Sequence, residues 1–169
     1  YSAAIGYGTV AVGTGSAAFG PQSVAVGDYS VASGMNAMAQ GANSVAMGGG
    51  GGFTRGANAN NDGDVAIGAN SVAGASMFDP SFNGQTYDTA VGYNAQSTGG
   101  FGTALGYFST ASGLNSVATV DASIASGDNG AAYGPSSFAS GASSTALGDN
   151  SGAGGARAFA GGARTNAAG

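Results

Sequence analysis

The sequence predicts an all-β fold, a parallel β-roll in which each coil has 14 residues and contributes two short strands. Three observations predict it: a seven-residue repeat, apolar residues at alternate positions within each repeat, and Gly, Asn or Pro where each strand would end. The chain has 169 residues, of which 35 are Gly, and only 7% are charged. Such a composition is also typical of a flexible linker, so the repeat decides whether the chain is a folded β-roll or a linker.

The repeat has the form x-x-Ala-x-Gly followed by two more residues. It is plain in segments 23–27 (SVAVG), 30–34 (SVASG) and 44–48 (SVAMG). Read across two interruptions it gives 21 units, and the Gly is missing only at Ala75 and Val120. A helix would lose about 1 kcal/mol at every repeat Gly. Apolar residues on both sides of Ala, at alternate positions, indicate a strand instead.

The Gly-x-x-Ser link between strands predicts a tight turn. Asn tolerates the left-handed conformation that such turns use, and it occurs in the link at 36, 43, 70, 94, 115, 129 and 150. Two units then make one coil with strands on opposite walls. About ten coils, stacked at about 4.8 Å per strand, would form a rod of roughly 50 Å.

The two outer faces of this roll are expected to differ. Residues two apart in a strand share a face, so the repeated Ala points inward and its neighbours point outward. One sheet should carry a long apolar outer face, which marks an interface in an obligate oligomer. We expect that inner sheet to consist of Val12, Val26, Ile67, Val91, Leu105, Tyr133 and Leu147. The alternative is a monomer with one slightly sticky outer face.

The composition excludes most chemistry. His and Cys are absent, and the three cations are Arg55, Arg157 and Arg164. The usual acid–base groups, activated nucleophiles and zinc or haem ligands are therefore missing, and we expect no catalysis and no cofactor. A net charge of −5 argues against nucleic-acid binding. The carboxylates of Asp62 and Asp64 are too few for calcium, and we expect no metal site.

Two loop insertions interrupt what is otherwise a single domain over residues 1–169, at about 49–63 and 76–87. Insertions in solenoids often lie on a binding face. The candidate ligand contacts in these loops are Phe53, Arg55, Phe78, Phe82 and Tyr87. Alternatively, the loops pack on a neighbouring chain.

The strand Ser-Val-Ala-(Val/Ile/Met)-Gly, alternating with Ser-x-Ala-Ser-Gly and Asn-rich turns, resembles the head repeats of YadA-like trimeric autotransporter adhesins. The match covers roughly residues 2–48, 64–75 and 88–169. The resemblance implies a left-handed parallel β-roll and a homotrimer with the inner sheets around the three-fold axis. It also implies a location on the Gram-negative outer membrane, attachment to host extracellular matrix or cell-surface proteins, and a role in virulence.

No neck, coiled-coil stalk, membrane anchor or signal peptide is recognisable in the sequence. We therefore expect an excised head fragment that reaches the membrane only through a stalk and anchor outside this chain. Two other functions stay open: an ice-binding solenoid, suggested by the outer column of Thr98, Ser112, Ser126 and Ser140, and a purely structural coat protein.

Overall fold

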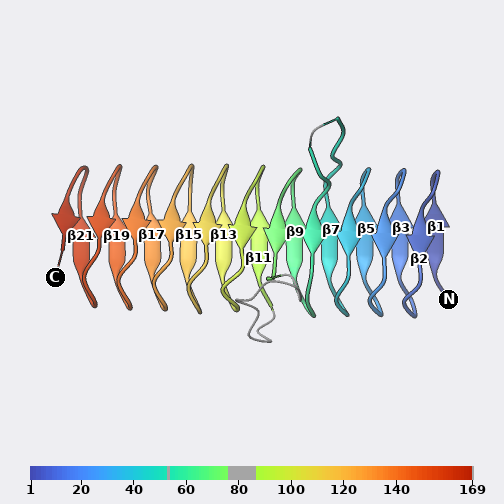
Figure 1. Ribbon diagram of the computed structural model, residues 1–169, viewed down its shortest axis with the longest axis horizontal. Coiled ribbons are helices and arrows are strands. Elements are labelled where there is room, and N and C mark those ends of the chain that lie inside the picture. The colour runs from blue at the N-terminus through green and yellow to red at the C-terminus, as the bar shows by residue number, and fades with distance from the viewer. Residues whose placement is uncertain (53, 76–86, 169) are drawn as a thin grey trace.

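The computed structural model describes residues 1–52, 54–75 and 87–168, which form 22 β-strands and no helix (Figure 1). The strands make two parallel sheets of 11 strands each. Sheet A consists of β1 (Ala3–Ile5), β3 (Ala17–Phe19), β5 (Val31–Ser33), β7 (Val45–Met47), β9 (Val65–Ile67), β11 (Thr89–Val91), β13 (Thr103–Leu105), β15 (Val117–Thr119), β17 (Ala131–Tyr133), β19 (Thr145–Leu147) and β21 (Phe159–Gly161). Sheet B consists of β2 (Val10–Ala11), β4 (Val24–Ala25), β6 (Met38–Ala39), β8 (Asn58–Ala59), β10 (Val72–Ala73), β12 (Gln96–Ser97), β14 (Thr110–Ala111), β16 (Ile124–Ala125), β18 (Phe138–Ala139), β20 (Gly152–Ala153) and β22 (Asn166–Ala167). In this part of the chain no helix is long and apolar enough to cross a membrane.

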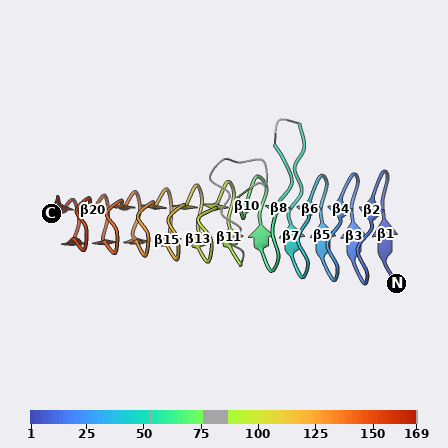
Figure 2. The same cartoon turned by 60° about the horizontal axis from the view of Figure 1, so that its bottom comes forward.

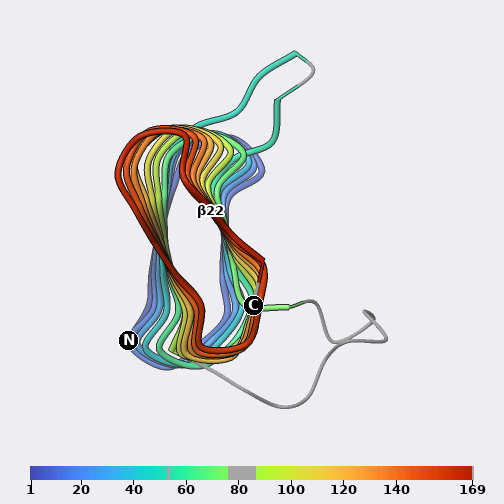
Figure 3. The same ribbon diagram turned by 90° about the vertical axis from the view of Figure 1, so that its left-hand side faces the viewer.

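The chain alternates between the two sheets, and each coil contributes one strand to each of them. Ala18 in β3 pairs with Ala32 in β5, and Ala25 in β4 pairs with Ala39 in β6. Successive coils therefore repeat in register. Figures 1 and 2 show the resulting rod with the chain termini at opposite ends, and Figure 3 shows the coils superposed along its axis. The predicted roll of two-stranded coils is confirmed.

The interior of the roll is a ladder of Ala side chains from both sheets. Ala32 and Ala46 in sheet A are fully buried, as are Ala25 and Ala39 in sheet B. The two sheets meet so closely that a methyl group fills the space between them, which confirms the predicted inward direction of the repeat Ala. The ladder is broken at Ser97, which is also fully buried.

Each coil turns through two tight bends closed by the residue before the next strand. Ser30 is typical: its backbone N and its Oγ both donate to the carbonyl oxygen of Gly27, at 3.3 and 2.7 Å. The residue before this Ser has a positive φ, the conformation that a type II turn requires at its third position. All seven Asn expected in turns have a φ between 52° and 60°.

The first interruption is shorter than the sequence indicated, because β8 lies inside residues 49–63. Val45 pairs with Val65 across it, a spacing of 20 residues where an ordinary coil has 14. The prediction of one long loop over 49–63 is therefore wrong, and the insertion amounts to six residues. Ala59 joins the buried ladder, while Asn61 stands in the repeat position of Gly and donates its side-chain amide to Ala75 O at 3.1 Å.

This additional strand completes a coil that the sequence analysis did not count. The roll accordingly has 11 strands in each sheet, where about ten coils were expected. The second interruption has the expected length: Val65 pairs with Thr89, a spacing of 24 residues and therefore ten more than usual. Most of it, residues 76–86, lies outside the described part of the chain.

Candidate binding surfaces

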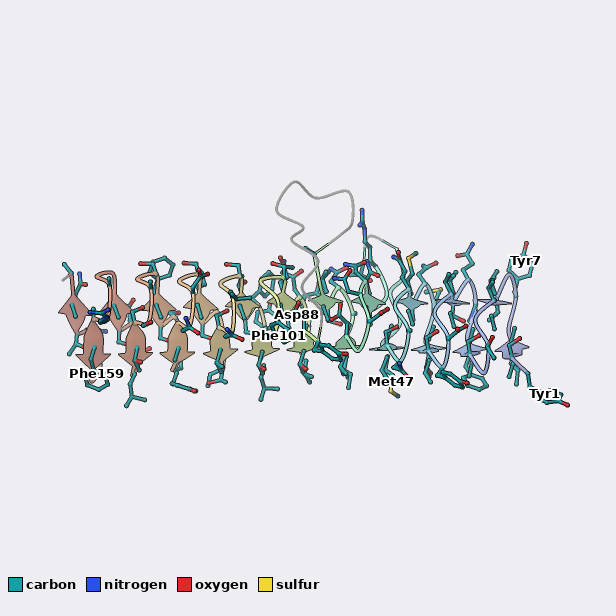
Figure 4. The ribbon with its side chains drawn as sticks, turned by 90° about the horizontal axis from the view of Figure 1, so that it is seen from below. Tyr1, Tyr7, Met47, Asp88, Phe101 and Phe159 are labelled. Atoms are coloured by element: carbon teal, nitrogen blue, oxygen red, sulfur yellow. The ribbon has the colours of Figure 1, made fainter. Side chains whose placement is uncertain are left out.

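Sheet A presents a column of large apolar side chains on its outer face. The column is formed by the residues that follow the buried Ala in each strand: Ile5, Phe19, Met47, Ile67, Val91, Leu105, Tyr133 and Leu147, interrupted by Ser33, Thr119 and Gly161. Neighbouring members pair directly in the sheet, as Met47 does with Ile67. Leu105 is 48% exposed and Leu147 is 49% exposed. Figure 4 shows Met47 and Phe159 projecting from the same side of the rod.

The corresponding column on sheet B is small and polar over most of its length. From the third coil onward it consists of Gln40, Asn60, Gly74, Thr98, Ser112, Ser126, Ser140, Gly154 and Ala168. Large apolar residues occur in it only at Val12 and Val26, next to β2 and β4. The residue before the buried Ala also points outward, and on sheet B this column includes Val10, Val24, Met38, Val72, Ile124 and Phe138. The two faces therefore differ in the column after Ala, while both carry apolar side chains in the column before it.

The predicted inner sheet mixed residues from both sheets and needs correction. Ile67, Val91, Leu105, Tyr133 and Leu147 do share sheet A. Val12 and Val26 belong to the face of sheet B instead. The cause is the seven-residue unit that contains β8. When this unit is not counted, every strand before it is assigned to the wrong sheet. The buried-Ala pattern Asn58-Ala59-Asn60 could have revealed this unit, and with it the apolar residues Ile5, Phe19 and Met47 on sheet A.

The first insertion projects from the edge where the chain passes from sheet A to sheet B, which we call the A-to-B edge. Figure 3 shows it extending away from the roll, toward the side on which β22 lies. Thr54 closes a turn within it by donating its N and Oγ1 to Gly51 O at 3.1 and 2.9 Å. The insertion rejoins the roll at Arg55, whose backbone N donates to Asn70 Oδ1 at 2.6 Å and whose carbonyl accepts from Asn70 N at 3.0 Å. Arg55 thus starts from a fixed backbone, and its side chain is exposed.

Arg55 lies between two shallow grooves on the sheet B side of this edge. One, of about 290 Å³, is lined by Arg55, Gly56, Asn58, Asn70, Val72, Asn94 and Gln96. The other, of about 260 Å³, is lined by Asn36, Met38, Thr54, Arg55, Gly56 and Asn58. The linings of both grooves therefore contain several carboxamide groups, which donate and accept hydrogen bonds.

Aromatic rings cluster on the A-to-B edge just beyond the larger groove. Tyr93 stacks on Tyr107 with ring centroids 5.6 Å apart, and Phe108 meets Tyr107 edge-on at 4.5 Å. All three are between 40% and 56% exposed. Tyr93 immediately precedes the groove residue Asn94, so the aromatic cluster begins one residue from the lining of the groove.

Of the predicted loop contacts, Arg55 and Tyr87 fall within the described residues. Tyr87 lies on the opposite edge, where the chain returns from sheet B to sheet A, and stacks on Phe101 at 6.1 Å. The structure therefore places Arg55 and Tyr87 on different edges of the roll. Phe53, Phe78 and Phe82 lie outside the described residues.

A buried pair of carboxylates, which the sequence analysis did not single out as a pair, lies in the coils next to the second interruption. Asp64 and Asp88 occupy the turn position that is usually Ser, and both are fully buried; Asp88 is labelled in Figure 4. Asp64 accepts hydrogen bonds from the backbone N of Asn61 and of Asp88, each at 2.8 Å. Burial raises the pKa of Asp64 from 3.8 to about 6 and also raises the pKa of Asp88.

Two substitutions in the repeat accommodate the Asp88 carboxylate. Ser97 replaces the inward Ala and donates its Oγ to Asp88 Oδ1 at 2.9 Å. Gly102 replaces Ser and donates its N to the same oxygen at 2.9 Å, while a Cβ at this position would come within 3.0 Å of it. The other oxygen, Oδ2, is buried with no hydrogen-bond partner among the described residues.

Asp62 does not join this pair. Its Oδ1 accepts from the backbone N of Ala42 at 2.7 Å, at the surface. Among residues 1–52, 54–75 and 87–168, no three His, Cys, Asp or Glu side chains come close enough together to hold a metal ion.

Comparison with known families gives repeated matches to one model, described as the YadA head domain repeat (2 copies). The matches fall at residues 4–30, 11–37, 25–50, 85–109, 98–119 and 139–165. Together they cover more than half of the chain, on both sides of the two interruptions. A search of curated proteins found no match to the chain.

Proposed function

The chain belongs to the YadA head family, and from that premise we propose that it is the trimeric head of a surface fibre that attaches bacteria to host extracellular matrix or host cells. The family is one of bacterial surface-exposed adhesins and is not known for catalysis. The observation that carries the proposal is the contrast between the two columns that follow the buried Ala: on sheet A the column is apolar along most of the rod, and on sheet B it is small and polar from the third coil onward.

The apolar face supports assembly. A column of Leu, Ile, Met, Phe and Tyr side chains along most of the rod is larger than the isolated exposed apolar residues of an ordinary monomer. Burying a side chain of this size completely would contribute about 1.5–3 kcal/mol to the free energy of association. Packing sheet A of three copies around a common axis removes the face from water, and the β-roll then gains the large core that its Ala ladder does not supply.

The same arrangement leaves sheet B and the first insertion at the outside of the assembly. Repetition presents equivalent surfaces coil after coil and copy after copy, so weak individual contacts add up through multivalency. This suits attachment to extended, repetitive matrix molecules. The ice-binding alternative is less well supported, because the outer column of sheet B contains Thr only at Thr98.

Two measurements test the proposal. Native mass spectrometry of the purified chain should give a species three times the 15.7 kDa chain mass. The same sample should bind at least one of immobilised collagen, fibronectin and laminin, and should bind cultured host cells. A monodisperse monomer with an intact fold would refute the assembly, and failure on every matrix protein and cell type would refute the adhesive role.

A matched variant locates the attachment surface. Deleting residues 76–85 removes ten residues and restores the ordinary spacing of 14 between β9 and β11. A deletion variant that stays trimeric and loses attachment would assign the contact to the second interruption. Unchanged attachment would assign it to the roll or to the first insertion.

A further inference from the structure

We infer that the groove beside Arg55 binds an acidic saccharide, that is, a sugar chain carrying a carboxylate. The inference rests on the proposed adhesive function and names the chemical class of one of its ligands. Three features of the A-to-B edge carry it: the amide lining of the groove, the electrostatic isolation of Arg55, and the exposed aromatic cluster next to it.

The lining of the groove suits hydroxyl groups. Asn58, Asn94 and Gln96 each offer two N–H donors and one carbonyl acceptor, and Val72 is the one large apolar residue among them. A sugar hydroxyl both donates and accepts, so neighbouring hydroxyls on a ring can pair with such amides. The fourth amide of the lining belongs to Asn70. The hydrogen bond that the backbone N of Arg55 donates to Asn70 Oδ1 holds this side chain in place, which reduces the entropy lost on ligand binding.

The charge on this edge suits a carboxylate. Among the described residues up to Phe108, Arg55 is the only charged side chain on the A-to-B edge, and the next one along this edge, Asp121, lies in the coil after Tyr107. Asp28 and Asp62 lie on the opposite edge, where they accept hydrogen bonds from the backbone of neighbouring coils. No ion pair joins Arg55 to a carboxylate within the described ranges. Its guanidinium can therefore bind an incoming carboxylate through two parallel hydrogen bonds.

The aromatic cluster suits the apolar face of a sugar ring. Tyr93, Tyr107 and Phe108 pack against one another and are each 40–56% exposed. Aromatic side chains supply large, rigid contact surfaces at little cost in entropy. Arg55 and Phe108 are separated by three coils, about 14 Å at the usual strand spacing. A saccharide of a few units would span the distance between the cation and the rings.

The groove also remains accessible in the proposed trimer. Asn58, Val72 and Gln96 belong to sheet B, and sheet A is the face expected to pack against partners. Three equivalent grooves per head would raise the apparent affinity for a surface that carries many copies of the saccharide.

The test uses the intact trimer and three soluble probes. These are 3′-sialyllactose, a disaccharide of glucuronic acid and N-acetylglucosamine, and uncharged lactose, each titrated by isothermal calorimetry and by saturation-transfer NMR. We expect at least one acidic probe to bind about tenfold more tightly than lactose. Equal binding of acidic and neutral probes, or no binding of either acidic probe up to about 10 mM, would overturn the inference.

Arg55→Gln should weaken binding of the acidic probe about tenfold, because it removes a charge-assisted hydrogen bond. Arg157→Gln is the matched control, since Arg157 is exposed on the opposite edge and its loss changes the net charge equally. Tyr107→Ser should weaken acidic and neutral probes alike. The inference fails if Arg55→Gln has no effect, if Arg157→Gln has the same effect, or if a hexaglutamate peptide competes as well as the saccharide.

These outcomes separate the inference from the proposed function. A trimer that attaches to matrix or cells but binds neither acidic probe refutes the acidic saccharide and leaves the adhesive role standing. A trimer that binds an acidic probe through Arg55 but attaches to none of the matrix proteins or cells supports the groove and refutes the adhesive role.

Discussion

Glycine occupies the same position of the repeat at both edges of the roll because a Cβ there would meet the backbone of the next coil, and at the A-to-B edge it has a second, conformational reason. At the A-to-B edge Gly106 has a φ of 140°, a conformation that residues with a Cβ rarely adopt. At the opposite edge Gly27 has no positive φ, but a Cβ on it would overlap the carbonyl of Gly41 in the next coil. One residue type therefore satisfies two constraints, which is why the seven-residue period is so regular although alternate turns differ.

Val120 breaks this rule and gives a first prediction. It stands in the Gly position of the A-to-B edge with a φ of 82°, which is unfavourable for a β-branched residue. Val120→Gly should relieve about 1–2 kcal/mol of backbone strain and raise the midpoint of thermal unfolding. The control is Val117→Gly in β15, which lies in an ordinary strand conformation and should lower it. A lower midpoint for Val120→Gly would show that the apolar side chain of Val120 contributes more than its strain costs.

At the scale of the single element, the coils around the second interruption are adapted to let the chain leave the roll and return. Asp64, Asp88, Ser97 and Gly102 all depart from the repeat, and they depart together. Asp88 takes the place of Ser, Ser97 donates to it, and Gly102 makes room for it and donates as well. The departures form one buried hydrogen-bonded unit and are not independent lapses in the repeat.

Ser97→Ala tests that interpretation, because it restores the repeat while removing a donor to a buried carboxylate. We expect a loss of about 1–3 kcal/mol in the free energy of unfolding, measured by chemical denaturation. Ser112→Ala is a control with the same chemical change on the exposed face of sheet B, and it should be close to neutral. If Ser97→Ala proved as stable as the parent chain, Asp88 would not depend on that hydroxyl.

The buried carboxylates also predict how stability depends on pH. The pKa of Asp64 is about 6 in the folded chain, against 3.8 for a free side chain, and the pKa of Asp88 is shifted in the same direction. Between these values the folded state binds more protons than the unfolded state, so stability falls as pH rises through this range. Each pKa unit corresponds to about 1.4 kcal/mol, and the contribution of Asp64 should be lost by about pH 7, one unit above its folded pKa.

Thermal unfolding followed by circular dichroism between pH 4 and 8 measures this dependence. The midpoint should be highest near pH 4 and lowest above about pH 7. Asp64→Ser, which restores the usual turn residue, should flatten much of the profile. A midpoint that rises between pH 4 and 6 would contradict the assigned shifts.

How much of this was predictable from the sequence depends on whether a residue follows the repeat or departs from it. The roll, the inward Ala and the Asn turns could be predicted, because each residue answers to a local constraint that recurs in every coil. The coil of β8 was missed because Asn61 replaces the Gly that marks a unit. The isolation of Arg55 and the aromatic cluster could not be predicted, because both depend on which edge of the roll each turn occupies. Turns alternate between the two edges, so one uncounted unit places every turn before it on the wrong edge.

At the scale of the whole molecule, the asymmetry of the two sheets determines what the rod can do. A solenoid of small coils buries little within each repeat, so its stability comes from stacking and from any surface it can share. The Ala ladder contributes only methyl groups, while the large apolar side chains lie outside it, in a nearly continuous column on sheet A and in smaller groups on sheet B and the two edges. In the proposed trimer, other copies cover the column on sheet A, and sheet B remains available for other partners.

A pair of charge substitutions tests this asymmetry and the corrected assignment of the sheets together. Leu105→Asp should break the assembly, because it would bury an unpaired carboxylate in an apolar interface. Val26→Asp makes a similar change at a side chain that is 46% exposed, but on sheet B, so it should leave the assembly intact. Native mass spectrometry and size-exclusion chromatography distinguish the species, and circular dichroism checks the fold. If Val26→Asp dissociated the oligomer as Leu105→Asp does, Val12 and Val26 would belong to the interface after all, and the interface would have to involve both sheets at the N-terminal end of the rod.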